Sequence, residues 1–334
     1  MKTSTDRALA EVDMKAALTQ LALFCGQPSV AAQDLGMEKM ASLVAGALDQ
    51  LGAEVEYLPT ASHPCLYGRV RGGDGPTLLF YNHYDVQPAE PFEEWSTPPF
   101  QLTRRGDLLF ARGTADNKGN LVARMAAVAA WQRAEGQPPG DVIFLVEGGE
   151  EVGSPDLEAV VANNAERLRC DGVLWESGYQ DPEGRPILHL GVKGNLYVEL
   201  VVDAGRRDLH SSYAPLVPNP AWRLVTALAT IRSPSGRVLL PGFYDDVQEP
   251  DAADLSLLAA IPFDDIRWRD NFGISDFIDG VKGAEAKRRL YFSPTCNIAG
   301  LSSGYGGDGA KTVLPAKARA KIDFRLVPDQ EPAK

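Results

Sequence analysis

The sequence predicts an α/β protein built from two domains. The larger domain is expected to hold a mixed sheet flanked by helices, and the smaller is an inserted α+β domain. Between residues 53 and 175, short apolar segments alternate with helical patterns, and Val142–Val146 is apolar throughout, as in a strand buried on both faces. Near residue 187 the pattern changes to neighbouring strands separated by loops rich in Gly and Pro. A chain of 334 residues with 44% hydrophobic residues is long enough for both domains.

Hydrophobic spacing and turn residues define the elements of the first half. Helices are expected at residues 8–24, 33–51, 120–133 and 154–168. Strands are expected at residues 53–58, 65–70, 77–81, 142–146 and 172–175. Gly52 is expected to end the second helix, and Ser154 to cap the fourth with Pro155 at its first position.

The second half is expected to contain three further strands and three further helices. The strands are placed at residues 187–192, 196–202 and 318–326. The helices are placed at residues 220–231, 251–260 and 283–290. We therefore predict a first domain over residues 1–203, an inserted domain over 204–314, and a return to the first domain over 315–334.

Composition narrows the class of partner and the compartment. The net charge of −12 argues against nucleic acid or an anionic membrane surface as a partner. No apolar stretch approaches the 18 or so residues of a membrane span. The first residues lack the apolar core of a signal peptide, and the four cysteines form no CxxC pair. These observations predict a cytoplasmic protein with reduced thiols.

Three short acidic clusters follow strand-like segments, at residues 82–85, 113–119 and 147–151. His83 and Asp85 lie two residues apart, so on a strand both side chains share one face and a carboxylate can orient an imidazole ligand. The alternative for this pair is a surface histidine beside a solvated aspartate. Asp116 opens a helix and could bridge two cations, or simply cap that helix.

Glu150 and Glu151 are adjacent acids after a buried strand and a Gly-Gly turn. Like charges held close together cost free energy unless a cation is near or one group is protonated. One can bind a metal while the other acts as a general base, although a solvated acidic loop is the alternative. Glu176 follows the next strand and could add a ligand or be a surface acid. Ends of successive strands are where open α/β sheets place their sites.

The order His83, Asp85, Asp116, Glu150, Glu151 and Glu176 resembles the M20 metallopeptidases, in particular their cytosolic non-specific dipeptidase and carnosinase-like branch. The resemblance covers nearly the whole chain. Further matching segments are Gly113–Gly119, Asp208–Ser211, Pro241–Val247, Lys311–Pro315 and Phe324–Pro328.

The resemblance implies roles for the acidic clusters. His83, Asp116, Glu151 and Glu176 would bind two divalent ions, Zn or Mn, with Asp116 as the bridge. The pairing of Glu151 and Glu176 with the two ions stays open. Asp85 would orient His83, and Glu150 would be the base that activates water. The Asp116–Asn117 peptide bond is expected to be cis.

The resemblance also assigns a role to the inserted domain, which would form a lid and a homodimer contact. His210 would reach the active site of the other subunit and polarise the scissile carbonyl. Arg325 would bind a substrate carboxylate, for which its planar fork is suited. Asn297 and Thr312 are further candidates for substrate contact.

The sequence departs from the family pattern in three places. The family has another ligand histidine near its C-terminus, whereas the histidines here are His63, His83, His189 and His210, so part of the catalytic domain is expected to be missing. Ser212 stands where the family usually has Gly, and Glu176 where this branch often has Asp.

The expected activity is hydrolysis of dipeptides or short peptides by water that two metal ions activate. The alternatives are an N-acyl amino acid deacylase of the same fold, and a truncated, inactive protein that retains the dimerisation domain.

Overall fold

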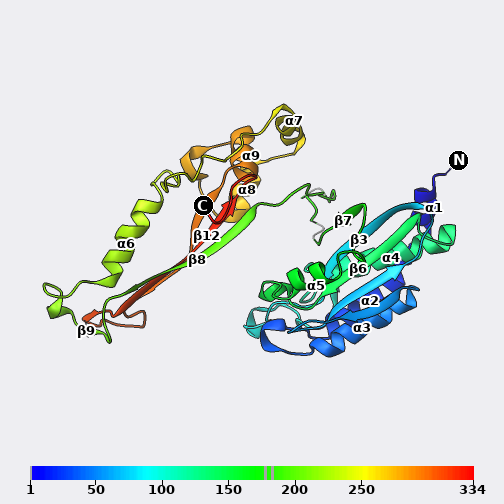
Figure 1. Ribbon diagram of the computed structural model, residues 1–334, viewed down its shortest axis with the longest axis horizontal. Helices are drawn as coiled ribbons and strands as arrows, with labels where there is room; N and C mark the ends of the chain where they lie inside the picture. Colours follow the sequence, from blue (N-terminus) through cyan, green and yellow to red (C-terminus); the bar gives the residue numbers. More distant parts are fainter. Residues whose placement is uncertain (1, 177–178, 182–183) are drawn as a thin grey trace. The chain divides into compact units, whose positions relative to one another are not determined.

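The computed structural model describes residues 2–176, 179–181 and 184–334, and the chain divides into two compact units, Met1–Leu188 and His189–Lys334 (Figure 1). The first unit holds a five-stranded mixed sheet in the order β1-β2-β6-β3-β7. Its strands are β1 (Glu54–Leu58), β2 (Cys65–Val70), β3 (Gly75–His83), β6 (Gly140–Glu147) and β7 (Gly172–Leu174). Strands β3, β6 and β7 are parallel, whereas β1 and β2 pair antiparallel. The mixed sheet and all five predicted strands of this half are confirmed.

Side chains of the central strands alternate between two apolar cores because successive residues of a strand point to opposite faces. Phe144 and Val146 pack with helices α2 (Met14–Gly26), α3 (Met37–Gln50) and α4 (Lys118–Glu135). Ile143 and Leu145 pack on the other face with α5 (Leu157–Asn163). The uninterrupted apolar run of β6 therefore reflects a strand that helices cover on both sides.

Two predicted helices differ from the structure. The helix expected at residues 8–24 is divided into α1 (Ser4–Ala10) and α2, because the Asp13 side chain caps α2 by accepting a hydrogen bond from Ala16 N at 2.9 Å. The helix expected at residues 154–168 covers only α5. Ser154 does not cap it, because its Oγ donates to Glu147 Oε1 at 2.9 Å and its φ is 51°.

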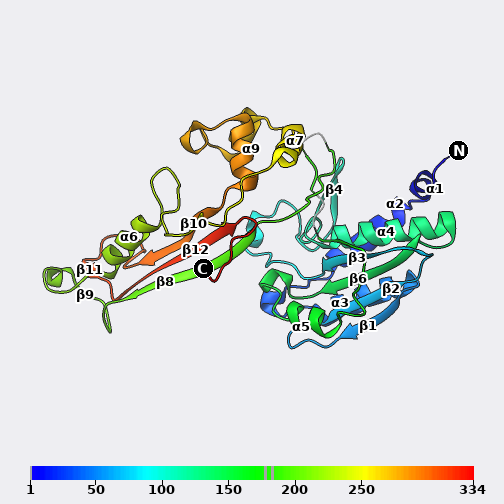
Figure 2. The same ribbon diagram turned by 45° about the horizontal axis from the view of Figure 1, so that its top comes forward.

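The second unit contains a three-stranded antiparallel sheet in the order β10-β12-β8 (Figure 2). Its strands are β8 (Gly194–Asp203), β10 (Thr295–Ser303) and β12 (Lys317–Leu326). Helix α6 (Pro220–Ile231) packs on this sheet through Leu224 and Leu228. The remaining helices are α7 (Ala252–Ala260), α8 (Asp265–Phe272) and α9 (Gly283–Phe292). Short pairs are formed by β9 (Leu209–His210) with β11 (Val313–Leu314), and in the first unit by β4 (Thr103–Arg105) with β5 (Leu108–Phe110).

The strand predicted at residues 187–192 is wrong. These residues are described, and they form no strand, while Leu188, Leu190 and Val192 are 70%, 82% and 90% exposed. An apolar alternation predicts a strand only where a neighbouring strand supplies hydrogen bonds, and the ladder with β12 begins at Gly194.

The boundary between units also differs from the predicted domain boundaries. It falls after Leu188, not after residue 203, because β8 is paired with β12 along its whole length. Strand β12 was expected to return to the first domain, yet it lies at the centre of the second unit's sheet. Within the described part of the chain, no helix combines the length and apolar character needed to cross a membrane.

Candidate functional site

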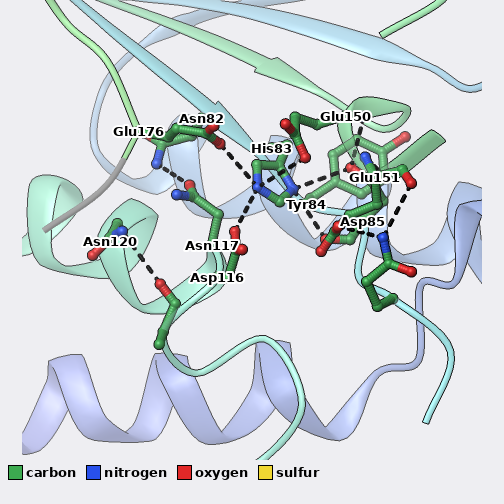
Figure 3. Close-up of polar contacts among 12 residues, drawn as sticks. Asn82, His83, Tyr84, Asp85, Asp116, Asn117, Asn120, Glu150, Glu151 and Glu176 are labelled. Atoms are coloured by element: carbon green, nitrogen blue, oxygen red, sulfur yellow. Dashed lines mark hydrogen bonds and ion pairs between the residues drawn. The ribbon is translucent and has the colours of Figure 1, made fainter. Parts of the chain in front are cut away.

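The parallel strands β3, β6 and β7 deliver the predicted acidic clusters to one edge of the first unit's sheet (Figure 3). His83 is the last residue of β3, Glu150 and Glu151 follow β6 in the 3-10 turn Glu150–Val152, and Glu176 follows β7. Asp116 approaches from the loop before α4. The carboxyl ends of parallel strands meet at the same edge, so these residues converge although they are far apart in the sequence.

His83 lies at the centre of this group and is fully buried. Its Nε2 is 2.9 Å from Asp116 Oδ1, 3.0 Å from Glu176 Oε2 and 3.8 Å from Glu150 Oε2 (Figure 3). Burial lowers the pKa of His83, but the contacts with Asp116, Asp85 and Glu176 outweigh it and raise the pKa to about 12. The carboxylates therefore strongly favour a positive charge at Nε2 of His83.

Asp85 holds the opposite side of the imidazole. Nδ1 of His83 lies 3.1 Å from the backbone oxygen of Asp85 and 3.2 Å from its Oδ1. The same buried carboxylate accepts hydrogen bonds from the backbone N–H groups of Glu150, at 3.3 Å, and Glu151, at 2.9 Å. Asp85 thus directs Nε2 toward the other carboxylates and fixes the turn that carries the two glutamates.

Glu150 and Glu151 have different surroundings. Burial, followed by the neighbouring Glu176 carboxylate, raises the pKa of Glu150 to about 7. A carboxyl group with a pKa near neutrality is suited to accept and return a proton. Burial also raises the pKa of Glu151, whereas a hydrogen bond from Gln87 Nε2, 2.7 Å from Glu151 Oε2, opposes this shift.

The Asp116 loop is closely packed. The Asp116–Asn117 peptide bond is cis, as the family resemblance predicts. Asn82, at the end of β3, donates a hydrogen bond through Nδ2 to Asn117 Oδ1. A Cβ at Gly119 would lie 2.0 Å from the carbonyl oxygen of Thr114, so only glycine fits where α4 begins.

Gly119→Ala is expected to destabilise the protein by about 1–3 kcal/mol, because the added methyl must displace backbone. Chemical denaturation followed by circular dichroism would measure the change. The matched control is Gly46→Ala in the exposed face of α3, where nothing lies within 4 Å of the added Cβ. That substitution is expected to stabilise by about 0.5–1 kcal/mol. Equal stability of the two variants would contradict the close approach at Gly119.

Two of the predicted site residues of the second unit lie beside each other at the β9–β11 pair. His210 is exposed, its Nδ1 is 2.9 Å from Ser212 Oγ, and its Nε2 is 3.3 Å from Thr312 Oγ1. Ser212, a departure from the family pattern, therefore orients the imidazole directly.

Asn297 and Arg325 form a second group, on strands β10 and β12. Asn297 Nδ2 donates to Asp323 Oδ2 at 3.0 Å, and Arg325 Nε is 3.6 Å from Asp323 Oδ1. The Arg325 side chain is 52% exposed, which leaves the guanidinium accessible. Asp323 was not predicted as a site residue, although its position two residues before Arg325 puts both side chains on one face of β12.

Three further polar residues around the site were not predicted. Asn82 and Asn117 are buried next to His83 and Asp116, respectively. Arg124 is 7% exposed on α4 and donates to backbone and side-chain oxygens at the strand ends. The available signal was a lone arginine within the apolar sequence 121–131.

The donor set fits divalent cations. Two groups of ligand atoms lie close enough to share an ion: His83 with Glu150 and Glu151, and His83 with Asp116 and Glu176. Glu176 Oε2 is buried and, among the described residues, receives no hydrogen bond. This oxygen lies 3.0 Å from His83 Nε2 but gains no aligned hydrogen bond, and a cation bound there would satisfy it. Imidazole with carboxylates suits Zn and Mn alike.

Two protein-family models match the chain. One describes peptidase family M20/M25/M40 and matches residues 79–255. The other describes a peptidase dimerisation domain and matches residues 190–334.

Individual proteins are similar over most of the chain. The Cys-Gly metallodipeptidase dug1 of Schizosaccharomyces pombe is 32% identical over 99% of this chain and 74% of its own length. The human Beta-Ala-His dipeptidase is 30% identical over 87% of this chain, and the chain spans only 60% of that sequence. The crystal structure of the M20 family metallo-carboxypeptidase Sso-CP2 from Sulfolobus solfataricus superimposes with a TM-score of 0.91 at 40% identity, covering 96% of this chain and 73% of that one.

Proposed function

This chain belongs to peptidase family M20/M25/M40, and from that premise we propose that it hydrolyses dipeptides or short peptides with the help of two divalent cations. The observation that carries the proposal is the convergence of Asp116, Glu150 and Glu176 on Nε2 of His83. The similar yeast and human proteins are dipeptidases by name, which favours a dipeptide over a longer substrate.

We assign the ligands as follows. His83 and Glu176 would hold one cation, because their Nε2 and Oε2 atoms are 3.0 Å apart. Glu151 would hold the other, on the side of Gln87. Asp116 would be the ligand that the two cations share. Bound there, divalent cations would supply Lewis acidity toward a water molecule and the scissile carbonyl.

Two side chains of the chain, Glu150 and Asp85, would transfer or hold the protons. Glu150 would accept a proton from the attacking water and return it to the leaving amine, as its pKa of about 7 allows. Asp85 would keep the Nδ1 proton of His83 in place, so that Nε2 keeps its lone pair for the cation.

The second unit would supply substrate contacts. Arg325 would bind the substrate's carboxylate. Asn297, in the group around Asp323, and Thr312, beside His210, would make further substrate contacts. His210 of the partner subunit would polarise the scissile carbonyl. The match of residues 190–334 to a dimerisation domain supports the proposal of a homodimer. The free cysteines support a reducing, cytoplasmic setting, and the charge of −12 supports partners other than nucleic acid and membrane.

The test is an assay of the purified 334-residue chain with Cys-Gly, β-Ala-His and N-acetyl amino acids. We expect hydrolysis of dipeptides that requires added Mn²⁺ or Zn²⁺ and stops reversibly with a chelator. Turnover of N-acetyl amino acids in place of dipeptides would instead identify a deacylase. Hydrolysis that persists in the metal-free, chelator-treated protein would overturn the proposal.

A further inference from the structure

The position of Glu176 is not explained by the sheet. Strand β7 pairs with β3 through only three residues, Gly172, Val173 and Leu174. Glu176 lies two residues beyond this ladder, yet its Oε2 is 3.0 Å from His83 Nε2. Something other than strand pairing must hold the end of β7 against the end of β3.

Arg124 of α4 makes that connection. Its Nη1 donates to the backbone oxygen of Tyr81 at 2.6 Å and to Asn82 Oδ1 at 2.7 Å. Its Nη2 donates to the backbone oxygen of Trp175. The rings of Tyr81 and Trp175 also stack, with centroids 3.8 Å apart and an interplanar angle of 19°. One guanidinium thus joins two strand ends.

These contacts lie within two residues of candidate metal ligands in the chain. Asn82 precedes His83, and Trp175 precedes Glu176. Asn82 extends the connection to a third segment, because its Nδ2 donates to Asn117 Oδ1, next to Asp116. Arg124 therefore contacts the His83 and Glu176 segments directly and is connected to the Asp116 segment through Asn82, while its hydrogen bonds go to atoms other than the ligand atoms.

We propose that Arg124 is a positioning residue that sets the separation of His83 and Glu176, and hence the affinity of one cation position. This inference rests on the proposed function. The planar fork of arginine places its donors at fixed angles, whereas the single ammonium of lysine cannot reach acceptors on both strand ends. The shape of the side chain, and not only its charge, is therefore required.

The test is Arg124→Lys, titrated with Mn²⁺ alone by calorimetry and by the electron paramagnetic resonance of free Mn²⁺. We expect affinity at one position to fall by roughly 10- to 100-fold, as is typical for residues that orient ligands. The weakened position should be the one that Glu176→Ala abolishes and Glu151→Ala retains. Circular dichroism and thermal melting would establish that the variant is folded.

The matched control is Arg69→Lys, which breaks an arginine pair with Asp141 on strands β2 and β6 and should leave Mn²⁺ affinity unchanged. Unchanged affinity in folded Arg124→Lys, or an equal loss at both positions, would overturn the positioning role alone. Absence of Mn²⁺ binding by the wild-type chain would overturn the metal centre and the inference with it.

A second variant covers the case in which Arg124→Lys does not fold. Asn82→Ala removes one of the three acceptors that hold the Arg124 guanidinium in place, the Asn82 Oδ1 atom, and also the connection to Asn117. Weaker Mn²⁺ binding at the Glu176 position in this variant would support the network, and wild-type affinity would overturn it.

Discussion

Glu150→Gln is expected to lower kcat for dipeptide hydrolysis by about 10²- to 10⁴-fold while leaving Mn²⁺ affinity within a few-fold of wild type. The substitution keeps the size of the side chain and removes its ability to accept a proton. Glu150 Oε2 is 3.8 Å from His83 Nε2, farther than the corresponding oxygens of Asp116 and Glu176. That greater distance favours a base over a ligand.

Two measurements separate these roles. Steady-state kinetics at saturating substrate would give kcat, and calorimetry would give the affinity for Mn²⁺ in the same preparation. Glu158→Gln, on the exposed face of α5, is the matched control and should match wild type in both. A large loss of Mn²⁺ affinity in Glu150→Gln would show that Glu150 is a ligand and that the base must be sought elsewhere.

The fold was predictable where the sequence marks both ends of an element. The limits of α6 match the prediction because Pro220 occupies the start of the helix and Asn219 caps it. β2 matches because an apolar run is bounded by turn residues. In contrast, β10 was not predicted, since its sequence, Thr295–Ser303, is largely small and polar and its burial is slight. Its conformation depends on the ladder with β12, which no local pattern records.

The site was predictable to the extent that its residues occur in short motifs. His83 with Asp85 and Glu150 with Glu151 are neighbours in the sequence, so their chemistry could be recognised together. Arg124 could not be recognised in this way, because its acceptors belong to Tyr81 and Asn82 at the end of β3 and to Trp175 just after β7. An arginine that binds backbone oxygens can contact any residue type, and therefore leaves no signature in its partners' sequence.

Asp116→Ala is expected to weaken Mn²⁺ binding more than any other single substitution at the site. Asp116 Oδ1 lies 2.9 Å from His83 Nε2 in the group with Glu176, and its charge also acts on Glu151 of the other group, which supports the proposed bridging role. Loss of a residue that only orients ligands costs roughly 10- to 100-fold in affinity. Loss of a ligand shared by two cations should exceed that range at both positions.

The same substitution should cost little stability when no metal is present, which distinguishes ligand loss from misfolding. The Asp116 carboxylate is mostly exposed, so solvent screens the ion pair with His83 that is lost, and relief of its repulsion with Glu151 offsets part of that cost. Thermal melting in a chelator should therefore give nearly equal Tm values for Asp116→Ala and wild type. Added Mn²⁺ should raise Tm only for wild type, because a cation that binds the folded state alone stabilises it by mass action. Equal stabilisation of both proteins by Mn²⁺ would refute the bridging role of Asp116.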